Sequence, residues 1–110
     1  MLKIPSKVPE KGFYYHYKHD PKKGVQDCAY EVLGVGYHTE DNCRLEDVHM
    51  VVYRSLYKEP DGGKIYLRPL EMFMENVTKE GRTFPRFNKI TDLKIVTLLE
   101  KVRDGMYRTK

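Results

Sequence analysis

Arg68 is the residue whose chemistry stands out most in this sequence. It precedes Pro69 in a segment rich in β-forming residues. A guanidinium on a β surface can hold a carboxylate or a phosphate through two parallel hydrogen bonds. The alternative is an internal ion pair, for which the candidate partners are Glu71, Glu40 and Glu46. We expect the internal pair, because partly buried arginines usually find a partner within the protein.

Two histidines form a second set of candidate binding residues. His16 and His38 fall at polar positions near the ends of predicted strands, where they could share an anion or a metal with Glu40. They could equally close the sheet through internal hydrogen bonds. His16 and His19 are spaced H-x-x-H, but a strand splays two side chains at this spacing. We therefore predict no metal site.

Familiar catalytic patterns do not occur in the sequence. Cys28 and Cys43 lack a neighbouring base or a partner at zinc-ribbon spacing, so we interpret them as small apolar residues. Gly34 and Gly36 lie inside a predicted strand rather than at a strand-to-helix turn, which argues against a phosphate-binding loop. No serine-nucleophile or paired-carboxylate motif is present. We expect no cofactor and no catalytic residue.

Tyrosine is unusually frequent, with nine Tyr and no Trp. Exposed rings could stack on bases while basic side chains meet phosphates. The candidates for such a platform are Tyr14, Tyr15, Tyr17, Tyr53, Tyr57 and Tyr66, with Lys18, Lys22, Lys23 and Arg54 nearby. We expect Tyr15, Tyr17 and Tyr30 to fill the core instead. For Tyr53 and Tyr57 the sequence does not decide between a place in the core and a place on a binding surface.

Short strands must position these side chains. Alternating apolar and polar residues predict strands at 13–18, 28–38, 48–57 and 65–68. Proline and glycine at 59–63 predict a hairpin, and Pro69 must end the fourth strand's ladder because it has no N–H. Glycines in the second strand are typical of a bulge. Residues 70–77 fit either a helical turn or a strand, and a further short strand is expected around 84–90 after a turn at 79–82.

The last part of the chain is predicted to be an amphipathic helix. Its apolar residues recur with helical spacing at Ile95, Leu98, Leu99, Val102 and Met106. Thr91 or Asp92 would cap the helix and Gly105 would end it. We expect the stripe to pack on its own sheet, and a homodimer through Ile95, Leu98, Leu99 and Val102 is the next alternative. The polar face is mixed in sign, which disfavours a membrane surface.

The bulk properties describe one small domain. The chain has 110 residues and a net charge of +4, which permits an anionic partner without requiring one. We divide it into an extended arm at 1–11, a barrel-like domain at 12–90, and the helix and tail at 91–110. The expected fold class is mainly β (β-rich α+β), a partly open barrel of about five short antiparallel strands with a C-terminal helix. The start of the chain shows no leader pattern, so we expect a cytoplasmic location.

Four segments together resemble a known family. They are Tyr15-His16-Tyr17-Lys18, Tyr30-Glu31-Val32-Leu33-Gly34-Val35-Gly36-Tyr37-His38-Thr39-Glu40, Val51-Val52-Tyr53-Arg54-Ser55-Leu56-Tyr57 and Arg68-Pro69-Leu70-Glu71-Met72-Phe73. In this order they look like a bacterial and phage domain-of-unknown-function family, number sixteen fifty-three, over roughly residues 13–90. The resemblance implies a compact SH3-like barrel. It implies no activity.

Three functional hypotheses follow. The first is a non-enzymatic binding or adaptor module that holds a partner protein or nucleic acid on an aromatic and basic surface. The second is a small ligand-binding or catalytic pocket that uses Arg68 with His38, His16 and Glu71 or Glu40. The third is an oligomerising structural protein. We favour the first, because acid–base chemistry needs positioned groups that the spacing does not indicate.

Overall fold

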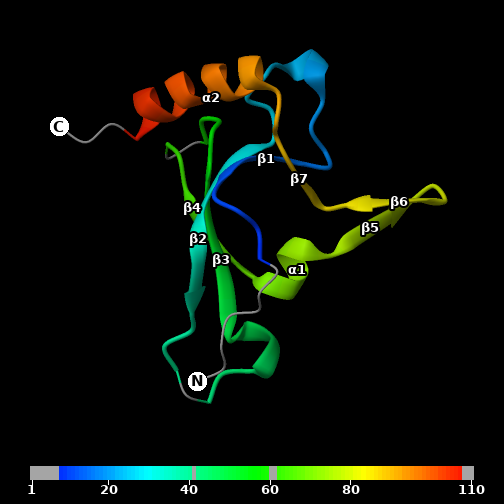
Figure 1. Ribbon diagram of the computed structural model, residues 1–110, viewed down its shortest axis with the longest axis vertical. Helices are drawn as coiled ribbons and strands as arrows, with labels where there is room; N and C mark the ends of the chain where they lie inside the picture. The colour runs from blue at the N-terminus through cyan, green and yellow to red at the C-terminus, as the bar shows by residue number, and fades with distance from the viewer. Residues whose placement is uncertain (1–7, 41, 60–61, 108–110) are drawn as a thin grey trace.

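The molecule is built around one open antiparallel sheet. The computed structural model describes residues 8–40, 42–59 and 62–107. Five strands follow the order β4-β3-β2-β1-β7, and a separate hairpin pairs β5 with β6 (Figure 1). The strands are β1 (Gly12–His16), β2 (Ala29–Tyr37), β3 (His49–Ser55), β4 (Ile65–Pro69), β5 (Asn76–Lys79), β6 (Arg82–Pro85) and β7 (Phe87–Lys89). The helices are α1 (Leu70–Met74) and α2 (Leu93–Met106), with 3-10 turns η1 (Pro21–Lys23) and η2 (Leu45–Asp47). The predicted fold class is confirmed: the protein is mainly β, with an open, bent sheet and a C-terminal helix.

Strand β2 contains the predicted bulge. Its pairing with β3 shifts register between Val32 and Gly34, so Leu33 has no partner opposite it. An extra residue on one strand bends that strand and increases its twist. The shift also reverses which side chains of β2 face which side of the sheet, because side chains alternate along a strand.

Each face of the sheet buries its own apolar core, because successive side chains point in opposite directions. The α1-side core consists of Tyr14, Val32, Val51, Tyr53, Leu70, Phe73 and Phe87. The α2-side core consists of Phe13, Ala29, Leu56, Ile90 and Leu99. Neighbouring residues Phe13 and Tyr14 thus serve opposite cores. A strand buried on both faces explains the aromatic run that the sequence shows at this point.

Helix α2 lies across one end of the sheet (Figure 1). Asp92 is its N-cap, and the carboxylate accepts hydrogen bonds from the backbone N–H of Lys94 at 2.9 Å and of Ile95 at 3.4 Å. Leu99 is fully buried in the α2-side core, whereas Leu98 is 49% exposed. The expectation that Leu98 packs on the sheet with the rest of the apolar stripe is therefore wrong. The sheet covers only part of the apolar face of α2.

The end of α2 also differs from the expectation. Gly105 does not stop the helix, which continues to Met106. The Tyr107 hydroxyl donates to the backbone carbonyl of Ser55, and its ring lies 4.0 Å from the Arg54 guanidinium. These contacts hold the last turn against the sheet, so a glycine is not needed to end the helix.

The region after Pro69 resolves what the sequence left open. Residues 70–74 form the short helix α1, and β5 follows it. The single strand expected around 84–90 is instead two strands, since β6 pairs with β5 and β7 pairs with β1. The chain changes partner at Arg86, whose N–H donates to Glu75 O at 3.1 Å while its carbonyl accepts from Tyr17 N at 2.9 Å.

The predicted N-terminal arm is described only in part. Residues 1–7 lie outside the described residues. Val8 packs against the α1-side core, and the Glu10 carboxylate pairs with the Lys89 ammonium at 2.6 Å. The described end of the arm therefore lies along the sheet. Among the described residues, no helix has the length and apolar content needed to cross a membrane.

Candidate anion-binding site

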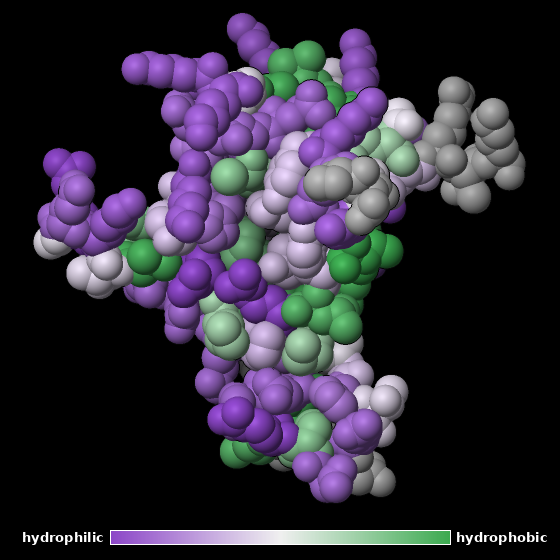
Figure 2. All heavy atoms as spheres, turned by 180° about the vertical axis from the view of Figure 1, so that it is seen from behind, coloured by the Kyte–Doolittle hydropathy of each residue, from purple (hydrophilic) through white to green (hydrophobic). Residues whose placement is uncertain are grey.

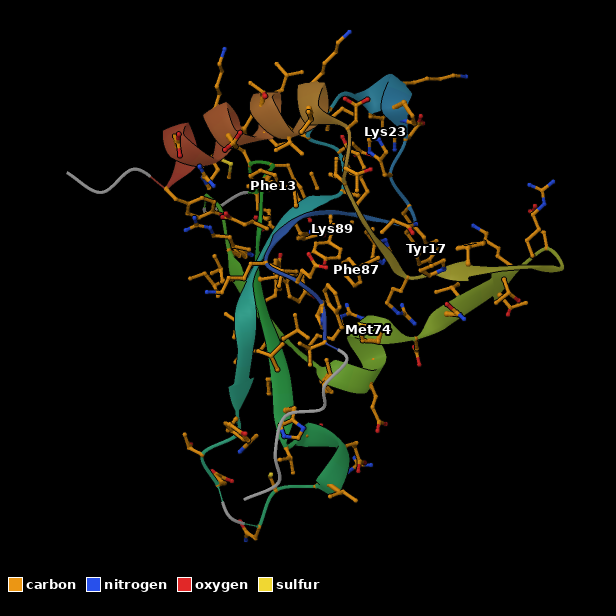
Figure 3. The ribbon with its side chains drawn as sticks, in the orientation of Figure 1. Phe13, Tyr17, Lys23, Met74, Phe87 and Lys89 are labelled. Atoms are coloured by element: carbon orange, nitrogen blue, oxygen red, sulfur yellow. The ribbon has the colours of Figure 1, made fainter. Side chains whose placement is uncertain are left out.

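The structure brings His16 and Arg68 together around one aromatic ring. His16 ends β1 and lies opposite Phe87 of β7 in the ladder, with the two rings edge to face at 5.1 Å. Arg68 comes from β4, and its guanidinium lies 5.6 Å from the centroid of the same Phe87 ring. Phe87 points inward from β7 (Figure 3) and stacks on Phe73 at 4.2 Å. The ring therefore stacks on Phe73 and lies against both polar side chains.

Arg68 is oriented by a tyrosine rather than by a carboxylate. Its Nε donates to the Tyr53 hydroxyl at 3.1 Å. The expected ion pair is not formed: within the described residues no carboxylate pairs with Arg68, and Glu46 pairs with Arg44 instead. The Nε bond fixes the plane of the guanidinium. Its two terminal nitrogens keep hydrogen-bonding capacity on a partly exposed surface.

His16 is an uncharged imidazole in a cationic environment. Burial, followed by the charges of Arg68, Arg86 and Lys18, lowers its pKa from 6.5 to about 4. The charged groups that shift it are cations. Its Nδ1 accepts the backbone N–H of Lys18 at 3.2 Å. Because Nδ1 is the acceptor, the single ring proton resides on Nε2, which makes that nitrogen a neutral donor.

Arg86 completes the group at the junction between β6 and β7. Its Nη2 pairs with the Glu75 carboxylate at 2.5 Å, and Glu75 itself is 47% exposed. Its Nε is buried and has no hydrogen-bond partner among the described residues. A buried unpaired donor is costly, so such a group commonly marks a place where a ligand or a water binds. We call His16, Lys18, Arg68 and Arg86 the cationic site.

A strip of tyrosines continues from the cationic site along the α1 side of the sheet. Tyr53 is only 4% exposed and stacks on Tyr66 at 5.5 Å, so it belongs to the core. Tyr30 meets Tyr57 edge to face, and their hydroxyls are 2.6 Å apart. Burial is the main cause that raises the pKa of Tyr30, Tyr57 and Tyr66. The Tyr66 hydroxyl donates to Glu59. Tyr57 and Tyr66 keep partial exposure, which leaves part of the strip open to solvent.

The segment that assigns the chain to a family contains all four residues of the cationic site. The family model described as Protein of unknown function (DUF1653) matches residues 12–89. The chain belongs to this family. Neither a curated protein nor a solved structure matches it. The DUF1653 segment contains His16, Arg68 and Arg86 but ends before α2, so the helix that covers the α2-side core lies outside the matched segment. The predicted resemblance is confirmed.

Three other predicted site residues of this DUF1653 domain do not contact Arg68: they are His38, Glu40 and Glu71. The His38 Nδ1 accepts the backbone N–H of Glu40 at 3.1 Å, in an exposed turn after β2. Glu71 is exposed on α1. No contact links any of the three to Arg68 in the described part of the chain. Of the residues expected to form one pocket, namely Arg68, His38, His16 and a glutamate, only Arg68 and His16 therefore lie together.

His38 instead lines a cavity on the opposite face of the sheet. This cavity of about 330 Å³ is lined by Gly36, Tyr37, His38, Thr39, Met50, Val52 and Leu67. Figure 2 shows hydrophobic side chains gathered below α2 within a mostly hydrophilic surface. Leu67 and Arg68 are neighbours in β4, so their side chains point to opposite faces. The cavity and the cationic site are therefore separate features.

Arg86 and Phe87 were missed by sequence reasoning. They lie within one predicted strand, where no local pattern marks the change of partner at Arg86. The neighbouring Pro85 was the available signal, because proline cannot donate to a ladder and often ends a strand. Within the described residues no three His, Cys, Asp or Glu side chains are arranged to hold a metal ion.

Proposed function

We propose that this DUF1653 domain is a non-enzymatic binding module that holds an anionic partner on its aromatic and basic face, and that the partner is single-stranded nucleic acid. The observation that carries the proposal is that His16 and Arg68 meet at the Phe87 ring, where the charges of Arg68, Arg86 and Lys18 all act on the neutral imidazole. A cluster of donors without an internal counter-ion for Arg68 favours an anion from outside the protein. Partly exposed tyrosine rings beside it offer a surface on which bases can stack.

Binding is favoured over catalysis by the properties of His16. A general base is most effective when its pKa lies near the working pH. The pKa of His16 is lowered to about 4, so the imidazole is a weak base at neutral pH. Its hydrogen bond goes to the backbone N–H of Lys18, and no described serine or cysteine side chain bonds to it. The site lacks the paired nucleophile and base that covalent chemistry uses.

Fluorescence anisotropy tests the proposal directly. Labelled single- and double-stranded oligonucleotides, and an acidic peptide of equal charge, are titrated with the protein at several salt concentrations. We expect the single strand to bind most tightly, with a log–log salt slope of roughly −2 if three cations each meet one phosphate. Substituting Arg68→Gln should make the slope less steep by about 0.7. Salt-independent binding, or preference for the acidic peptide, would overturn the nucleic-acid assignment.

We also propose a cytoplasmic location. It is supported by Cys28 and Cys43, which are both free thiols in the structure. Reduced cysteines are the normal state in that compartment. Thiol labelling under denaturing conditions of protein taken rapidly from cells would test this, since two free thiols per chain are expected and an oxidised pair would contradict it.

A further inference from the structure

The cationic site presents donors and almost no acceptors. Arg68 donates from Nε to the Tyr53 hydroxyl, and this bond orients the guanidinium. Its two terminal nitrogens have no hydrogen-bond acceptor among the described residues. The paired N–H groups of a guanidinium match two oxygens of one phosphate. Tyr53 is 4% exposed and anchored in the core, so the fork is preorganised. Preorganisation reduces the entropy that a ligand must overcome on binding.

His16 adds a donor at the same ring, and Arg86 adds a second arginine near His16. The Arg86 side chain is 23% exposed and is held at Nη2 by Glu75, while its Nε lacks a partner among the described residues. His16 contributes a neutral Nε2–H, because its Nδ1 is already an acceptor. His16 and Arg68 both lie against the Phe87 ring, and the charge of Arg86 acts on His16. Donors from β1 and β4 therefore meet at one ring, and the β6–β7 junction adds a cation near enough to act on His16.

The local charge matches a doubly charged anion better than a singly charged one. Arg68, Arg86 and Lys18 contribute three positive charges, and Glu75, which pairs with Arg86, contributes one negative charge. The balance of three minus one is plus two. A phosphate monoester carries about −1.5 to −2 at neutral pH, whereas a backbone phosphodiester carries a single charge. The monoester also offers three terminal oxygens to the available donors.

We propose that the cationic site binds a phosphate monoester, and that on a nucleic-acid strand this group is the terminal phosphate. The inference rests on the proposed function, because it names the part of the strand that the site recognises. A small phosphorylated molecule carries the same chemical group. The two sources are distinguished below by comparing a strand with its free phosphorylated nucleotide.

The test compares three oligothymidylates of one length that carry a 5′-phosphate, a 3′-phosphate or neither. Their affinities are measured at one salt concentration by anisotropy, with thymidine 5′-monophosphate and inorganic phosphate as competitors. We expect one terminal phosphate to tighten binding roughly tenfold or more, as two charge-assisted hydrogen bonds would. The gain should vanish in Arg68→Gln and fall sharply in Arg68→Lys, which keeps the charge but loses the fork.

Arg82→Gln is the matched control, because it removes the same charge from an exposed position of β6 outside the cationic site. It should keep the full preference for a terminal phosphate. Inorganic phosphate should also shift the NMR signals of the His16 ring and raise the pKa of His16, which a purely structural histidine would not show.

The outcomes separate this inference from the proposed function. Salt-dependent binding that is equal for all three oligonucleotides overturns the terminal-phosphate site but leaves nucleic-acid binding intact. Binding of no oligonucleotide overturns both. Equal affinity for the free monophosphate and the phosphorylated strand supports the phosphate site but overturns the strand as its source. A preference that Arg68→Gln leaves unchanged overturns the assignment to these residues.

Discussion

Truncation of one leucine in α2 tests how the helix is held. Leu99 is fully buried in the α2-side core, whereas its neighbour Leu98 is 49% exposed. Changing Leu99→Ala removes a buried isobutyl group and leaves a cavity, which typically costs about 2–5 kcal/mol. We expect about 3 kcal/mol here, because Phe13, Leu56 and Ile90 surround the site and come from separate elements that cannot close in together.

The matched control is Leu98→Ala. This change removes the same atoms from a largely exposed position, and alanine's higher helix propensity offsets part of the loss. We expect an effect within about 0.5 kcal/mol. The two variants differ by one position along one helix, so they share every other property of the sequence.

Urea denaturation followed by far-UV circular dichroism measures both variants. Leu99→Ala should lower the free energy of unfolding with an unchanged m-value, and the melting temperature should fall by roughly 10–20 °C. Equal effects of the two changes would refute packing of α2 on its own sheet through Leu99. If Leu98→Ala destabilised the protein more at low than at high concentration, α2 would instead be a subunit interface, which is the predicted homodimer.

Three further predictions concern charge and capping. Because the pKa of His16 is lowered from 6.5 to about 4, the unfolded chain binds more protons in this window, and stability should fall as pH falls through it. The loss should be about 1–2 kcal/mol after solvent screening, and His16→Gln should lack it in urea titrations above and below the window; an identical pH profile would contradict the argument. Glu31 accepts from Arg54 at 2.9 Å and from Arg103 at 3.2 Å, so Glu31→Gln should cost roughly 2 kcal/mol and less in high salt, and a salt-independent loss would count against the ion pairs. Asp92→Ala should cost about 1 kcal/mol by removing the N-cap, Asp92→Asn should restore most of it, and equal losses in calorimetry would reject capping.

Local sequence patterns predicted strands and the C-terminal helix correctly where neighbouring residues alone set the structure. The alternation at residues 13–18 predicted β1, and the apolar spacing after Asp92 predicted α2. Pro69 predicted the end of β4 because a missing N–H is a property of the residue itself. Such features depend on residues a few positions apart, so they can be predicted without knowing the tertiary structure.

The candidate site was only half predictable, and the bulge in β2 is the reason. Without it, His38 would share the parity of Tyr30 and Val32 and face the side of the sheet that carries Arg68. The register shift between Val32 and Gly34 places Val35 opposite Val51, which is also the partner of Arg68, and sends Gly36 and His38 to the other face. A shift of one residue reverses every side chain that follows it.

The sequence by itself determined the fold class, the family, and the presence of an arginine beside Pro69 as a candidate anion-binding residue. Only the tertiary structure decided what surrounds that arginine. Arg86 reaches the site because the chain leaves the β5–β6 hairpin there and joins β1 through β7, a pairing set by contacts between distant segments. The residue types are given by the sequence, but the pKa of His16 is lowered by burial and then by charges on separate strands and loops, which only folding brings together.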